Sequence, residues 1–131
     1  MFACGSPVVV SLDLWCSLDQ VAGAVLHRQR RRKSWTLAVV GDSYGVSRST
    51  VHRHEKGDRA WTLADLVRYG EICGLTLSEM AAEVELAAEA LRAEGVIVVV
   101  DRGQTGPEGV PLSIEQIAAI AWKEADDDDA T

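Results

Sequence analysis

The sequence lacks the features that mark several large classes of protein. Its three cysteines, Cys4, Cys16 and Cys73, form no C-x-x-C pair and no cluster with histidine. We therefore expect neither a disulfide framework nor a metal site. It has no Gly-rich phosphate loop, no H-E-x-x-H and no nucleophile elbow, so we expect no catalytic residues and no cofactor. Without a basic leader or an apolar run of about 20 residues, a cytoplasmic protein without membrane contact is expected.

A net basic charge is also lacking, because the formal charge is −7 at pH 7. The charge is distributed unevenly, however. Residues 27–68 hold ten Lys or Arg against four Asp or Glu, whereas residues 69–131 hold three against fourteen. A basic segment within an acidic chain indicates one positive surface, which is the electrostatic pattern of a protein that binds nucleic acid.

Capping signals divide the chain into helices. At four of the predicted helix starts, Ser or Thr is followed three residues later by Gln, Asp or Glu, which is the spacing of a capping box. The predicted helices begin after Ser17, Thr36, Ser47, Thr62, Thr76 and Ser113 and run to about residues 33, 44, 56, 73, 94 and 123. From helical spacing we expect these residues of the fourth and fifth helices to be buried: Leu63, Leu66, Val67, Ile72, Leu77, Met80, Val84, Ala87 and Leu91.

Two β-branched runs near the ends of the chain predict strands. Residues 8–15 alternate with period two, and residues 96–100 are Val or Ile throughout. The alternative for residues 8–15 is a disordered leader. Because a lone strand leaves unpaired backbone groups, we expect the two strands to pair, either within one chain or across a dimer. Residues 101–111, rich in Gly and Pro, predict a loop.

A short basic helix after a glycine turn is the most informative stretch. Gly45 allows the positive φ of a tight turn, and Ser47 caps the helix that follows. Val51 is its one apolar anchor, and Gly57 supplies its stop. Its remaining side chains are mostly basic or hydroxylated. A helix held on one side and exposing hydrogen-bond donors on the other is suited to reading the DNA major groove.

Residues 26–80 resemble the Cro/repressor-type helix-turn-helix family, also called xenobiotic response element-like, of phage repressors and their bacterial relatives. The resemblance rests on Gly41, Gly45, the run 46–51, residues 55–57 and the segment 62–80. It implies a mainly α fold: a five-helix repressor-type bundle, here with short β-strands near both ends and a C-terminal helix. It also implies sequence-specific binding of double-stranded DNA in transcriptional control.

The predicted elements divide the chain into four expected parts. Residues 1–16 form an N-terminal strand or arm, and residues 17–94 form the helix-turn-helix DNA-binding domain. Residues 95–125 form a strand-loop-helix extension, through which the chain would form a homodimer. Residues 126–131 form an acidic tail that composition predicts to be disordered.

Three residues depart from the family pattern. Leu37 stands where many members have a Gln that meets the DNA backbone, so a side-chain hydrogen bond is not expected there. His54 stands where an apolar residue is usually buried. It either contacts DNA or packs as a neutral side chain, and we favour packing. Trp61 stands where Pro is common and is expected to pack on the bundle.

The predicted DNA contacts fall into two groups. The first group contacts bases and consists of Arg48, Ser49, His52 and Arg53. The second contacts the DNA backbone and consists of Thr36, Ser47, Thr50, Lys56, Arg59, Arg30 and Arg31. For Lys56 and Arg59, plain surface charge is the alternative. For the arginines near residue 30, the alternative is a helix C-terminus that favours cations.

The function expected from these features is that of a transcriptional regulator, and specifically a repressor of phage immunity or Cro-like type. The alternative is an antitoxin that binds its own operator while its C-terminal extension neutralises a toxin enzyme. A neighbouring toxin gene, or growth rescue on co-expression, would separate the two. A third hypothesis is a protein-interaction module that uses the bundle without DNA.

Overall fold

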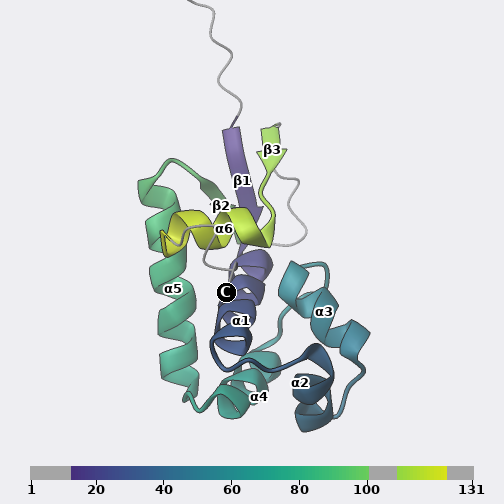
Figure 1. The fold of residues 1–131 in the computed structure, drawn as a ribbon. Coiled ribbons are helices and arrows are strands. Elements are labelled where there is room, and N and C mark those ends of the chain that lie inside the picture. Colours follow the sequence, from purple (N-terminus) through teal and green to yellow (C-terminus); the bar gives the residue numbers. More distant parts are fainter. Residues whose placement is uncertain (1–12, 101–108, 124–131) are drawn as a thin grey trace, which may run out of the picture.

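A computed structural model describes residues 13–100 and 109–123 of the chain (Figure 1). The structure is mainly helical with one small sheet, so the predicted fold class is confirmed. The predicted acidic tail and part of the first predicted strand lie outside the described residues. In chain order, the elements are β1 (Asp13–Ser17), α1 (Leu18–Arg32), α2 (Leu37–Tyr44), α3 (Arg48–Lys56), α4 (Leu63–Cys73), α5 (Leu77–Ala93), β2 (Ile97–Val99), β3 (Gly109–Pro111) and α6 (Ile114–Ala121).

Helix α1 lies at the centre of the bundle. It packs against α3 on one side, α5 on the other, and α6, which crosses it (Figure 1). Residues 21–26 are all buried, because α1 has neighbours on several sides. At Gly23, α1 approaches α3 very closely, since a Cβ atom there would lie only 2.3 Å from the carbonyl oxygen of Glu55. The backbone of α3 therefore rests directly on α1.

The helix termini follow the predicted capping pattern. Each predicted N-cap residue accepts a hydrogen bond from the backbone N–H three residues later. The side chains of Gln20, Asp65, Glu79 and Gln116 return the bond to the cap, which completes four capping boxes. Gly45, Gly57 and Gly74 adopt left-handed φ values at the ends of α2, α3 and α4. The local signals thus set where the helices begin and end.

The sheet joins the two ends of the described chain. Its strand order is β2-β1-β3, and both neighbours run parallel to β1. Trp15 pairs with Ile97 on one side and with Pro111 on the other. The two described strands therefore pair within one chain, but β1 ends at Ser17, later than predicted, and Trp15 is the one residue of the predicted first strand that pairs with β2 among the described residues. Strand β3 was not predicted, because Gly109 and Pro111 indicated a loop.

Of the nine residues predicted to be buried on α4 and α5, four are buried, three are half-buried and two are exposed. Met80, Val84, Ala87 and Leu91 of α5 are buried, as expected. The prediction that Leu63 of α4 is buried is wrong, because 66% of its surface is exposed at the start of that helix. Leu77, at the start of α5, is also exposed. The buried face of α4 instead holds Asp65, Tyr69, Gly70 and Cys73, a more polar set than an aliphatic pattern suggests.

Candidate nucleic-acid interface

The connection between α2 and α3 is tightly held. Gly45 has a φ of +88°, and the backbone N–H groups of Gly45 and Val46 both donate to the carbonyl oxygen of Gly41, at 2.7 and 2.9 Å. At Gly41 itself, a Cβ atom would lie 2.7 Å from the carbonyl oxygen of Val46. The lack of a side chain therefore lets the turn fold back on α2, which fixes where α3 begins.

The outer side of α3 presents the residues that were predicted to contact bases. Arg48, Ser49, His52 and Arg53 are all exposed, and their i, i+4 spacing places them on one face of the helix. Val51, on the opposite side, is fully buried. The arginines and His52 make no side-chain hydrogen bond or ion pair with any other residue that the structure describes. Their donors are thus available to a partner.

The predicted backbone contacts lie on several elements around this face. The Ser47 hydroxyl caps α3, 3.2 Å from the Thr50 amide nitrogen, and the Thr36 hydroxyl caps α2 in the same way. Lys56 is exposed, with its ammonium 4.0 Å from an Asp58 carboxylate oxygen. Exposed Arg59 follows in the loop after α3, and Arg31 lies exposed near the end of α1.

Arg30 does not present its guanidinium to solvent in this way. Its Nε and Nη2 donate to the two carboxylate oxygens of Glu55, at 2.6 and 3.0 Å, and its Nη1 donates to the carbonyl oxygen of Trp35. Only 16% of the Arg30 side chain is exposed. These bonds give Arg30 an internal role, in which it holds α3 against α1, and its contact with a phosphate stays a prediction.

Glu55 was not predicted as a functional residue, yet it is the buried anchor of α3. Its carboxylate also lies 2.9 Å from Nδ1 of His27 on α1. Burial alone would raise the pKa of Glu55, but the hydrogen bonds from His27 and Arg30, together with the Arg30 charge, hold that pKa below its usual value. Glu55 is therefore ionised and paired. Sequence spacing offers no signal for this contact, since its partners lie on another helix.

His54 packs inside the protein, which confirms the favoured prediction. Its Nδ1 lies 2.8 Å from the Tyr69 hydroxyl, and its Nε2 lies 3.4 Å from an Asp65 carboxylate oxygen. Burial lowers the pKa of His54, and the Asp65 charge only partly opposes that effect. The side chain is thus neutral near pH 7. A direct DNA contact by His54, the alternative, is excluded by its burial.

Trp61 packs on the helical bundle, as predicted. Its ring packs against those of His54 and Tyr69, at centroid distances of 5.3 and 4.9 Å. Its indole N–H donates to the carbonyl oxygen of His54, and its backbone N–H donates to Asp19 at the start of α1. The loop after α3 is thereby tied to three helices. Leu37, the third departure, is half-buried against the core.

Residues 21–84 match the family described as a helix-turn-helix domain. The match runs from α1 into α5, so the three strands and α6 lie outside it.

Two crystal structures of the clp gene regulator ClgR from Corynebacterium glutamicum are similar to this chain. One shares 23% identity at a TM-score of 0.53, over 59% of this chain and 81% of that chain. The other shares 22% identity at a TM-score of 0.49, over 52% and 88%. At such identities the likeness concerns the fold. No match to a curated protein reaches significance.

Other kinds of site were also considered. The described residues contain no group of three or more His, Cys, Asp or Glu side chains that could hold a metal ion. Among the described helices, none combines the length and apolarity needed to cross a bilayer. Cys16 and Cys73 are both buried free thiols, and burial raises the pKa of each. The exposed side of α3 is therefore the candidate site that the geometry supports best.

Proposed function

We propose that this chain is a sequence-specific DNA-binding transcriptional regulator that acts as a repressor. The observation that carries the proposal is the outer side of α3. There, Arg48, His52 and Arg53 are exposed and make no polar side-chain contact with other described residues, while the inner side of the same helix is fixed by buried contacts. A rigid helix with free cationic donors suits the major groove.

Each predicted contact then receives a role. Arg48 and Arg53 pair bidentately with guanines, and Ser49 and His52 read neighbouring base edges. The surrounding residues hold the DNA backbone and so position α3 without reading sequence. They are Thr36, Ser47, Thr50, Lys56, Arg59 and Arg31.

Repression follows if the occupied site overlaps a promoter, because bound protein and polymerase exclude each other. The fold shared with ClgR, a clp gene regulator, supports a regulatory role. No feature of the described residues favours the antitoxin hypothesis over the repressor hypothesis. The homodimer through the C-terminal extension stays a prediction, and the described strands of that extension pair with β1 of the same chain.

The test is selection of bound fragments from a base-randomised DNA pool. We expect Arg48→Ala to relax the preference at one base position, by about 1–3 kcal/mol of discrimination. Arg59→Ala should weaken binding to every sequence about equally, because a phosphate contact carries no sequence information. If about 5 phosphates are neutralised, log K should fall against log salt with a slope of about −4.5.

Two results would contradict the proposal. If Arg48→Ala and Arg53→Ala both leave affinity and base preference intact, then α3 is not the reading helix. If affinity for duplex DNA hardly changes between low and moderate salt, phosphate contacts do not contribute as proposed. A reporter gene placed behind the selected site tests repression: its expression should fall when the protein is produced.

A further inference from the structure

One glutamine connects the end of α3 to the beginning of α6. The Gln20 side chain accepts a hydrogen bond from the Ser17 backbone N–H through Oε1, and its Nε2 donates to the carbonyl oxygen of Leu112 at 2.9 Å. Leu112 immediately precedes Ser113, the cap of α6. On its other side, Gln20 abuts Gly57, where an added Cβ atom would lie 2.4 Å from Gln20 Cγ. The first turn of α6 is thereby placed beside the end of the reading helix.

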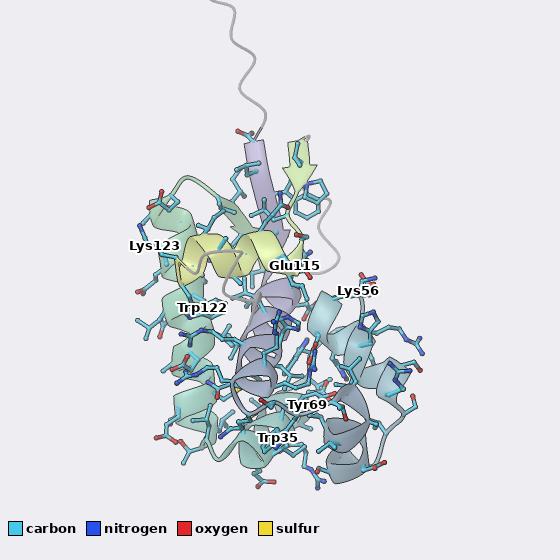
Figure 2. The ribbon with its side chains drawn as sticks, viewed as in Figure 1. Trp35, Lys56, Tyr69, Glu115, Trp122 and Lys123 are labelled. Carbon is cyan, nitrogen blue, oxygen red and sulfur yellow. The ribbon has the colours of Figure 1, made fainter. Side chains whose placement is uncertain are left out.

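A groove of about 410 Å³ lies between these elements. The start of α2 contributes Leu37 to its lining, and the loop after α3 contributes Asp58. Figure 2 shows Lys56 and Glu115 on two neighbouring elements, α3 and α6, and both side chains line the groove. The main walls are formed by His27 and Arg30 of α1, His52 and Lys56 of α3, and Ile114 and Glu115 of α6.

The groove continues the proposed DNA interface. His52 belongs both to the exposed face of α3 and to the groove wall, and Lys56 lies one turn further along the same helix. A duplex that receives α3 in its major groove brings a sugar-phosphate backbone along the side of that helix. The basic side chains of the α3 wall are suited to this polyanion.

We propose that α6 forms the outer wall of the DNA interface, that the groove between α3 and α6 receives one sugar-phosphate backbone of the duplex, and that Glu115 weakens this contact for every sequence. The inference rests on the proposed function. Glu115 is exposed in the first turn of α6 and makes no ion pair with another described residue. Its carboxylate charge therefore acts on whatever enters the groove.

The experiment compares Glu115→Gln with a matched control, Glu85→Gln. Glu85 is exposed on α5, which lies on the other side of α1 from α3 (Figure 1). Each variant removes one negative charge, so the two change the net charge equally. The probe is a short duplex of mixed sequence, and binding is measured by fluorescence anisotropy at low salt. We expect Glu115→Gln to lower Kd by about 2- to 5-fold relative to Glu85→Gln, as for one exposed charge pair, and the gap to close as salt rises.

A second readout needs no variant. In the wild-type protein, the backbone amide signals of Ile114 and Glu115 should shift on titration with the same duplex, while that of Glu85 should not. If the duplex binds but Glu115→Gln matches Glu85→Gln and the α6 amides stay unshifted, this inference is overturned and the proposed function stands. If the wild-type protein does not bind the duplex at low salt, both are overturned.

Discussion

The two sides of α3 are both polar, yet they differ in whether their side chains have partners. On the inner side, His54 and Glu55 are buried and bonded to Tyr69, Arg30 and His27. On the outer side, Arg48 and Arg53 are exposed and make no polar side-chain contact with other described residues. The inner polar contacts fix the orientation of the helix, and the outer groups remain exposed.

The largest effect on stability should come from breaking the ion pair on the inner side. Arg30→Met leaves the Glu55 carboxylate buried without its main partner, which should lower the free energy of unfolding by about 3–5 kcal/mol. The double variant Arg30→Met/Glu55→Leu should recover most of that loss, since no unpaired charge remains. Urea denaturation measures all variants.

The control for that prediction is Arg53→Ala on the outer side. Because Arg53 is exposed and has no described polar partner, this change should alter stability by less than about 0.5 kcal/mol. Equal destabilisation by Arg30→Met and Arg53→Ala would show that the two sides of α3 do not differ as described.

A smaller loss should follow from pushing α3 away from α1. Gly23→Ala places a methyl group against the backbone carbonyl oxygens of His54 and Glu55, so the helices must separate, at a cost of about 1–3 kcal/mol. Gly70→Ala is a matched control, because a Cβ atom added there would lie 3.1 Å from the nearest atom, the carbonyl oxygen of Leu75. Thermal unfolding followed by circular dichroism compares the two. A Gly23→Ala variant as stable as Gly70→Ala would contradict the close contact.

The smallest effect should appear as a pH dependence of stability. The pKa of His54 is lowered in the folded protein by burial, so the unfolded chain binds a proton more readily. Stability should therefore fall as the pH drops below about 6.5, the unfolded value. Glu55 and Asp65, whose folded pKa values are lowered, should add a further loss as the pH falls below about 4.

One substitution sharpens this measurement. His54→Phe should flatten the decline between neutral pH and pH about 5, because the buried group that resists protonation is gone. If the wild-type curve is already flat in this range, His54 does not titrate differently in the folded and unfolded states.

The helix boundaries and the exposed face of α3 were predictable because their causes are local. Ser47 and Thr36 cap helices with their own hydroxyl groups, and Gly45 takes a φ that other residues avoid. The spacing of Arg48 and Arg53 around Val51 then decides which residues face outward. These signals depend on neighbours within a few residues, which a sequence shows directly.

The remaining features depend on residues far apart in the chain. The contact of Arg30 with Glu55 joins two helices, and no spacing rule identifies it. Leu63 was expected in the core from its period, but polar Asp65 and Tyr69 are buried instead because Tyr44 and His54 bond to them. Pro111 indicated a loop, although Pro is tolerated in an edge strand such as β3.

The central position of β1 has a consequence for how the chain folds. Helices α1 to α5 form from neighbouring segments, but β1 can pair only when residues 97–99 and 109–111 arrive from the far end of the described chain. Such long-range closure is entropically costly and slow compared with local helix packing. We expect the sheet to be the last part to assemble. Until then, both edges of β1 stay open to pairing with other chains. We therefore expect this protein to be most prone to aggregate while the chain is being synthesised.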